Sequence, residues 1–170
     1  MLYSSKITLF MLSAAVLLVA FFKPARCSDT YRITITEGIN ECGIVGPLNS
    51  VVYNFDGNSD LLKVEKVTMK LHEAARSFAT IEGKKLETFF DHVDQLSKLP
   101  MINGLAPYDV FGKDTSILIL KNDKLLWAYG FSPDCIDKQA DKSQVSLSST
   151  QKSLFGSNIE GMTSDIKFSS

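Results

Sequence analysis

The segment from residue 116 to residue 129 constrains the fold more than any other part of this sequence. Two apolar runs, residues 116–120 and 125–129, flank the polar stretch Lys121-Asn122-Asp123-Lys124. Short β-rich runs around two turn-forming residues are typical of a β-hairpin, here with Asn122 and Asp123 as the loop and Lys121 opposite Lys124. Regular alternation then predicts one ribbon face made of Leu118, Leu120, Leu125, Trp127 and Tyr129. The other face is also apolar, with Ile117, Ile119, Leu126, Ala128 and Gly130, so both faces need cover and the fold must be layered.

The segments before this hairpin predict two strands followed by two helices. Residues 31–36 alternate apolar with polar and are β-branched, which favours a strand, and residues 51–55 favour a second one. From residue 60 to residue 81, apolar residues recur every three or four positions, which predicts a helix with one apolar stripe: Leu61, Val64, Val67, Leu71, Ala74, Phe78 and Ile81. A second helix is predicted over 84–99, ended by Pro100, with Leu86, Phe89, Phe90, Val93 and Leu96 on its buried side.

The chain after residue 143 is rich in serine and poor in aromatic residues. Such a composition predicts a weakly structured C-terminal tail over 150–170, or edge strands near 144–148 and 165–169. The expected fold is a single α+β domain over 28–149, in which an antiparallel sheet carries two helices on one face in the order ββααβββ. This order resembles that of PAS-like and profilin-like domains. The resemblance covers element order alone, so it implies no function.

The first 27 residues have the pattern of a secretory signal peptide. Lys6 precedes an apolar run over residues 7–22, which as a helix would span about 24 Å and fall short of the roughly 30 Å hydrocarbon core of a bilayer. Ala25 and Cys27 place small residues at the third and first positions before a cleavage site ahead of Ser28. We therefore expect a secreted, extracellular protein. The alternative is an uncleaved N-terminal anchor that makes the rest of the chain the ectodomain of a single-pass membrane protein.

Charge and cysteine content limit the partners and the compartment. The chain has 18 Lys and Arg against 19 Asp and Glu, and cleavage would remove three basic side chains and no acidic one, leaving a net acidic protein. This balance argues against nucleic acid and, after cleavage, against membrane as a partner. Cleavage would also leave two cysteines, Cys42 and Cys135, which we expect to form a disulfide in an oxidising compartment; the alternative is two separate buried thiols.

No residue pattern in the sequence indicates catalysis, a metal site or a cofactor. Neither His72 nor His92 has a second ligand at the spacing that a metal needs, and the chain has no Gly-x-Ser-x-Gly motif for a nucleophilic serine. We therefore expect a non-catalytic protein with no metal and no cofactor. The alternative is a secreted hydrolase whose carboxylates are brought together only by the fold.

The remaining signal is a surplus of apolar side chains. The loop over 101–111 and the aromatic face of the hairpin carry more apolar surface than solvated segments need, so they form either a second core layer or a binding surface. If these residues form a binding surface, the sequence predicts that it binds an extracellular protein or a small apolar ligand. Its residues are then Met101, Ile102, Leu105, Tyr108, Phe111, Trp127 and Tyr129.

Overall fold

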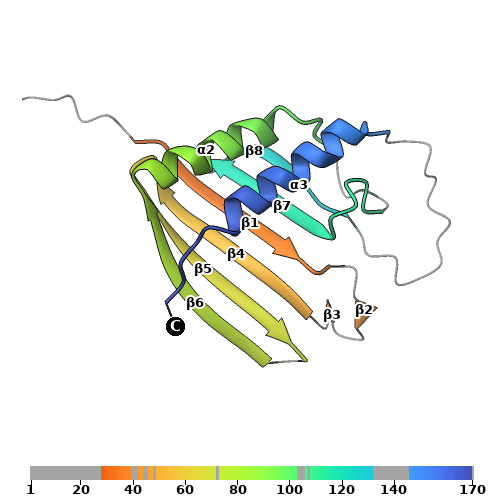
Figure 1. Cartoon of the computed structure of the whole chain (residues 1–170), viewed down its shortest axis with the longest axis horizontal. Coiled ribbons are helices and arrows are strands. Elements are labelled where there is room, and N and C mark those ends of the chain that lie inside the picture. Colours follow the sequence, from red (N-terminus) through yellow and green to blue (C-terminus); the bar gives the residue numbers. More distant parts are fainter. Residues whose placement is uncertain are drawn as a thin grey trace, which may run out of the picture.

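The computed structural model describes residues 28–39, 42–43, 46–47, 49–71, 73–102, 106, 108–131 and 146–169. These residues form an antiparallel six-stranded sheet with two helices, an α+β architecture (Figure 1). The strand order across the sheet is β6-β5-β4-β1-β7-β8. Along the chain the elements are β1 (Thr30–Glu37), β2 (Cys42–Gly43), β3 (Gly46–Pro47), β4 (Asn49–Asn58), β5 (Leu61–Lys70), β6 (Glu73–Glu82), α2 (Lys84–Ser97), β7 (Thr115–Lys121), β8 (Lys124–Tyr129) and α3 (Ser149–Thr163).

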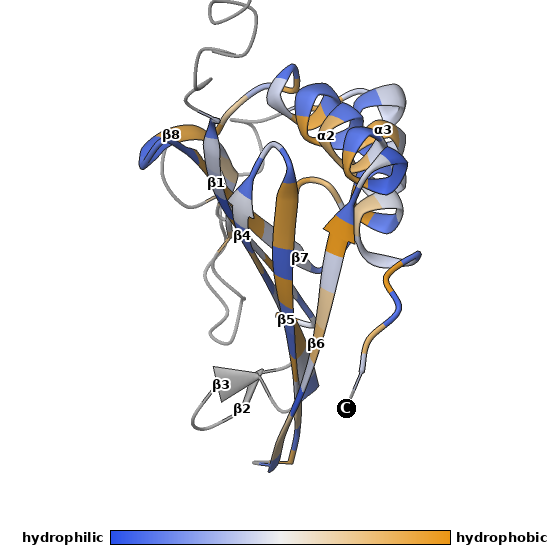
Figure 2. Ribbon diagram, turned by 90° about the vertical axis from the view of Figure 1, so that its left-hand side faces the viewer, coloured by the Kyte–Doolittle hydropathy of each residue, from blue (hydrophilic) through white to orange (hydrophobic). Residues whose placement is uncertain are grey.

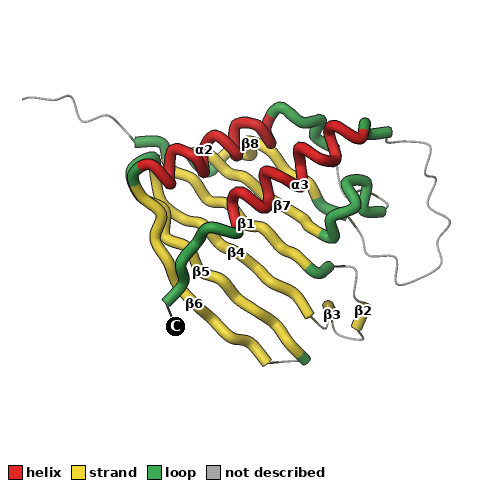
Figure 3. The backbone as a smooth tube through the Cα atoms, viewed as in Figure 1, coloured by secondary structure: helices red, strands yellow, loops and turns green. Residues whose placement is uncertain are grey.

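The two helices lie side by side on the same face of the sheet (Figures 2 and 3). They are joined by a hydrogen bond in which His92 Nδ1 donates to Asn158 Oδ1 at 2.8 Å. No described helix lies on the opposite face, which we call the helix-free face. Alternation along β1 separates the two environments, since Ile33 and Ile35 are fully buried towards the helices whereas Arg32 points to the helix-free face.

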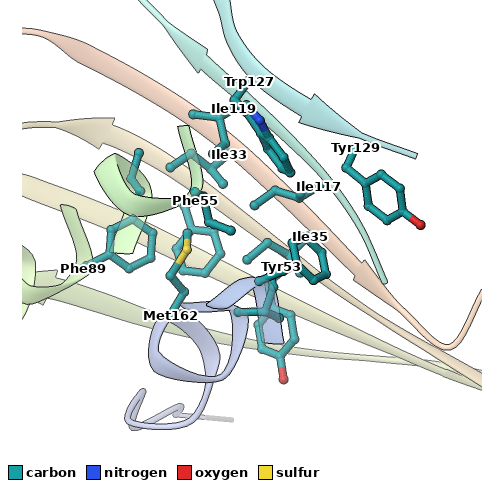
Figure 4. Packing of buried hydrophobic residues seen from close by; sticks show 14 of the residues in the cluster. Ile33, Ile35, Tyr53, Phe55, Phe89, Ile117, Ile119, Trp127, Tyr129 and Met162 are labelled. Carbon is teal, nitrogen blue, oxygen red and sulfur yellow. The ribbon is translucent and has the colours of Figure 1, made fainter. Parts of the chain in front are cut away.

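The hydrophobic core fills the space between the sheet and the helices. Phe89 of α2 packs on Phe55 of β4 with ring centroids 4.8 Å apart, and Met162 of α3 points to the same region (Figure 4). Phe155 of α3 stacks on Phe111 at 4.1 Å. The core therefore depends on both helices and on the segment that precedes β7.

Four predicted elements are present. β1 covers the predicted strand at 31–36, and β4 covers the predicted strand at 51–55. α2 forms residues 84–97 of the predicted helix at 84–99, and β7 and β8 form the predicted hairpin with Lys121 opposite Lys124. The loop residues Asn122 and Asp123 both have positive φ, of 51° and 56°, as a type I′ hairpin turn requires.

The predicted helix over residues 60–81 is wrong, because this segment forms strands β5 and β6. They pair antiparallel without interruption from Leu61 opposite Glu82 to Lys70 opposite Glu73. Of the predicted apolar stripe, Val64 and Ile81 are buried, but Leu71 and Phe78 are exposed. In this segment the side chains alternate between the two faces of the sheet with a period of two, and β-branched residues favour such strands. The spacings of three and four residues that predicted a helix arose by coincidence.

The predicted faces of the hairpin are also wrong, because β8 contains a β-bulge. Leu120 pairs with Leu125 as expected, but Ile119 pairs with Trp127, so Leu126 is an extra residue. One extra residue moves every later side chain to the other face. Trp127 and Tyr129 therefore face the helices, not the side that carries Leu118.

The C-terminal segment forms a helix, so the expectation of a weakly structured tail is wrong for residues 149–163. The Ser148 side chain accepts a hydrogen bond from the Gln151 backbone N–H, and the Gln151 side chain accepts one from the Ser148 backbone N–H, which is a capping box. Phe155, Ile159 and Met162 then form a buried face at helical spacing. The observed order of elements differs from ββααβββ, so the basis of the resemblance to PAS-like and profilin-like domains is lost.

Candidate binding surface

An apolar hollow of about 490 Å³ lies on the helix-free face, over β1, β7 and β8. Its apolar side is formed by residues of β7, β8 and the segment after α2: Met101, Ile102, Leu118, Leu125 and Ala128. Its polar side is formed by the hydroxyl residues Thr34, Thr36 and Ser116. The hollow is open to solvent on one side, as expected for a depression on a sheet and not for an enclosed cavity.

Three large side chains in the hollow remain exposed. Met101 is 48% exposed, Leu118 is 42% exposed and Leu125 is 54% exposed. Single exposed apolar side chains are ordinary on protein surfaces, but a cluster of them is typical of an interaction site.

Two hydrogen bonds bring Met101 and Ile102 to this face. The indole Nε1 of Trp127 donates to the Leu99 carbonyl oxygen at 3.0 Å, which ties the end of α2 to β8. After Ile102, the Ala106 N–H donates to the Gly130 carbonyl oxygen at 2.8 Å. Leu99 and Ala106 are therefore held at β8 and at the residue that follows it, and Met101 and Ile102 line the apolar hollow.

The centre of the helix-free face is polar. Thr34 Oγ1 donates to Asn54 Oδ1 at 3.2 Å, Asn54 Nδ2 donates to Glu65 Oε2 at 3.3 Å, and Arg76 forms an ion pair with Glu65 at 2.8 Å. These bonds cross β1, β4, β5 and β6 and give the hollow a polar flank. A partner that covers the hollow would meet apolar surface at one end and hydrogen-bonding groups at the other.

Arg32 of β1 forms ion pairs with two carboxylates beside the polar centre of this face. Arg32 lies 3.6 Å from Asp56 and 3.7 Å from Asp123, so both carboxylates share one guanidinium. Within the described ranges, no group of three or more His, Cys, Asp or Glu side chains is placed to hold a metal ion. The chemistry that this surface offers is therefore apolar contact with hydrogen bonding at its rim.

The structure separates the seven residues that the sequence predicted for binding. Met101 and Ile102 line the apolar hollow, and Tyr129 borders it while its ring packs on Phe111 and Phe155 towards the helices. The rings of Phe111 and Trp127 are buried in the core, and Tyr108 packs against the core. Leu105 and Cys135 lie outside the described residues, so the disulfide with Cys42 stays a prediction.

Sequence reasoning missed the hydroxyl residues of the hollow and placed its leucines beside the wrong neighbours. Leu118 and Leu125 were expected to share a face with Trp127, and the bulge at Leu126 moves Trp127 away from them. The alternation of Thr34 and Thr36 with buried isoleucines was the available signal for the polar wall.

The rest of the predicted loop has a structural role. The Tyr129 hydroxyl donates to Asp109 Oδ1 at 2.8 Å and accepts from the Val110 N–H at 3.0 Å. The Asp109 carboxylate also accepts from the N–H groups of Gly112 and Asp114. Burial and the hydrogen bond to Asp109 raise the pKa of Tyr129 well above its usual value, so the hydroxyl stays protonated as the donor.

The raised pKa of Glu37 predicts a pH effect on stability. Burial raises the pKa of the Glu37 carboxyl above its usual 4.5, and the positive charge of Lys66 offsets this only in part. The folded state therefore favours the neutral acid, and stability is lost as the pH rises from 4.5 through the folded pKa. We expect Glu37→Gln to raise the free energy of unfolding at pH 7 and to lose this gain as the pH falls below 4.5.

Urea unfolding of the wild type and of Glu37→Gln between pH 3 and pH 8 measures this difference. Glu82→Gln, on an exposed residue at the end of β6, is the matched control for the removal of one carboxylate. A loss of stability in Glu37→Gln at pH 7 would mean that attraction to Lys66 outweighs desolvation.

Comparisons with protein-family models, curated proteins and solved structures gave no significant match to this chain. The described residues contain no helix that is long and apolar enough to cross a membrane, and the apolar run over 7–22 lies outside them.

Proposed function

We propose that this chain is a secreted, non-catalytic binding protein that holds an extracellular protein partner at the apolar hollow. The observation that carries the proposal is the convergence of Met101, Leu118 and Leu125, all large and exposed, on a sheet face without a described helix. Leaving these side chains in water costs free energy that a partner could recover by covering them.

The openness of the hollow favours a protein over a small apolar ligand. Sites for small molecules bury most of the ligand surface, which a depression open on one side does not do. A protein partner brings its own surface, so it can insert one apolar side chain and close the hollow from above. The hydroxyls of Thr36 and Ser116 lie side by side at the rim, because the two residues pair between β1 and β7, and they can bond to polar groups around that anchor.

The extracellular location in this proposal rests on the N-terminal segment. The signal-peptide pattern of residues 1–27 and the two cysteines that remain after cleavage both support export to an oxidising compartment. An uncleaved segment would make the same domain an ectodomain, and its binding surface would be unchanged.

The double variant Leu118→Ser/Leu125→Ser tests the hollow as the binding site. Both side chains are exposed, so we expect the melting temperature to change little and partner affinity to fall at least about tenfold, the loss of an apolar anchor. Leu126→Ser is the matched control, since this leucine is partly exposed on the same strand but does not line the hollow.

Binding would be followed with a photo-crosslinking residue at position 118 in the native extracellular fluid, and affinity would then be measured with the crosslinked partner. Loss of binding in the double variant but not in the control supports the proposal. Equal binding by all three proteins would place the interaction elsewhere. Cleavage of the partner on mixing would contradict a non-catalytic role and favour the hydrolase alternative.

A further inference from the structure

A second pocket, of about 120 Å³, opens between α2, α3 and the end of β6, and we call it the inter-helix pocket. Its inner wall is made of side chains that belong to the core: Ile81, Phe89 and Met162. Its mouth is made of exposed polar residues: Lys85, Thr88 and Asp165. The inter-helix pocket therefore leads from the surface into the hydrophobic core.

Contacts between the two helices hold this pocket in a fixed shape. Gly161 of α3 lines it, and a Cβ at this position would overlap the ring of His92 of α2. The same ring is bonded to Asn158 of α3. Because the helices already touch beside the pocket, it cannot close by their moving together. At the mouth, Lys85 Nζ donates to the Asp165 carbonyl oxygen at 3.3 Å, which ties the chain after α3 to α2.

The inner wall favours an apolar occupant. Ile166, from the segment after α3, adds a fourth apolar side chain to the three core residues. A buried water needs two to four hydrogen-bonding partners, which these side chains do not offer. An apolar molecule would instead restore the close packing that an empty pocket lacks. An engineered apolar cavity of about 150 Å³ holds benzene, so a pocket of about 120 Å³ suits a molecule of about one aromatic ring.

Lys85 adds a hydrogen-bond donor at the mouth. Its ammonium group has three N–H donors, and the Asp165 carbonyl oxygen accepts from one of them. Among the described residues, no carboxylate lies within ion-pair distance of Lys85. The Thr88 hydroxyl donates to the Lys84 carbonyl oxygen at 3.1 Å, so Lys85 is the donor that a molecule in the pocket can reach.

We infer that the inter-helix pocket binds a small apolar molecule, about one aromatic ring in size, whose polar end accepts a hydrogen bond from Lys85. This site is separate from that of the proposed function. The inter-helix pocket lies on the helix side of the sheet, whereas the apolar hollow lies on the helix-free face, and the two share no residue.

The experiment is a titration of the purified protein with toluene and with benzyl alcohol, from about 10 µM to about 5 mM, followed by the NMR signals of the Ile81 and Met162 methyl groups. We expect both molecules to shift these signals. Benzyl alcohol should bind more tightly than toluene, because its hydroxyl oxygen can accept from Lys85. Lys85→Met removes the donor but keeps a side chain of similar length, so it should weaken benzyl alcohol at least about threefold and leave toluene unchanged.

Two variants that fill the pocket test its location. Thr88→Leu enlarges a side chain at the mouth, and Ile81→Phe enlarges one on the inner wall, so each should weaken both molecules at least about tenfold. Thr150→Leu is the matched control, since this threonine is exposed on α3 and does not line the pocket. Its affinities should equal those of the wild type.

The absence of a shift at Ile81 and Met162 with either molecule would overturn the inference. Equal affinities in the wild type and in the filled variants would also overturn it, because the molecules would then bind elsewhere. Benzyl alcohol that binds Lys85→Met as tightly as the wild type would refute the role of Lys85. Either filled variant alone decides the location if the other fails to fold.

Discussion

Replacing Trp127 with alanine should lower the free energy of unfolding by about 3–5 kcal/mol, the usual cost of truncating a large buried aromatic residue. The side chain is 2% exposed and contacts Phe155 of α3 with ring centroids 6.3 Å apart. Its indole also donates a hydrogen bond to the Leu99 carbonyl, which would be left without this partner in a buried environment. Urea denaturation with circular dichroism measures the change.

Two further variants separate the contributions at this position. Trp127→Phe keeps an aromatic ring but removes the indole donor, so we expect a smaller loss of about 1–3 kcal/mol. Leu126→Ala, one residue earlier at the bulge and 38% exposed, is the matched control and should cost less than about 1 kcal/mol. A Trp127→Ala protein that unfolds like the wild type but no longer binds its partner would contradict the core assignment and make Trp127 a binding residue.

The elements predicted correctly from the sequence are those in which the apolar pattern is supported by the residues at the boundaries or in the turn. Helix α2 combines an apolar stripe at helical spacing with Gly83 before it and Pro100 after it. The β7–β8 hairpin combines apolar runs with turn residues that tolerate positive φ. In both segments local propensity, pattern and boundaries agree, and such agreement is what makes a local prediction reliable.

The segment over 61–82 was mispredicted because its pattern fits two periods. Apolar residues at 64, 67, 71, 74, 78 and 81 match a helix, whereas Leu62 and Val64 alternate as in a strand, and both of the latter are buried. The choice is made by tertiary pairing, since β5 hydrogen-bonds to β4 on one side and to β6 on the other. The hydrophobic pattern of a single segment does not show which other strands that segment will pair with.

The candidate site was mispredicted for a different reason. The residues of the apolar hollow come from β1, β7, β8 and the segment after α2, and only the bulge at Leu126 decides which side chains of β8 reach it. A single extra residue is invisible in an apolar run that would fit either register. Sequence reasoning therefore found the apolar surplus but assigned its aromatic half to the wrong face.

The sequence contains features that predict the C-terminal helix, although its serine-rich composition argues against one. Ser148 and Gln151 have the spacing of a capping box, and the apolar residues Leu154, Phe155, Ile159 and Met162 follow at helical spacing. Serine-rich composition argues for disorder only when no apolar face is present to bury. Here the face is present, and α3 completes the layer of helices beside α2.

Replacing Phe155 with alanine should therefore lower the free energy of unfolding by about 3–5 kcal/mol, even though the residue lies in a serine-rich segment. Its ring is fully buried and packs on three aromatic rings, at 4.1 Å from Phe111, 5.5 Å from Tyr129 and 6.3 Å from Trp127. Ser153→Ala, on the exposed side of the same helix, is the matched control and should change stability by less than about 0.5 kcal/mol. Urea denaturation of both variants tests whether α3 is part of the core. A Phe155→Ala protein as stable as the Ser153→Ala control would mean that α3 does not fold together with the sheet, and the core would then have to be closed by α2 alone.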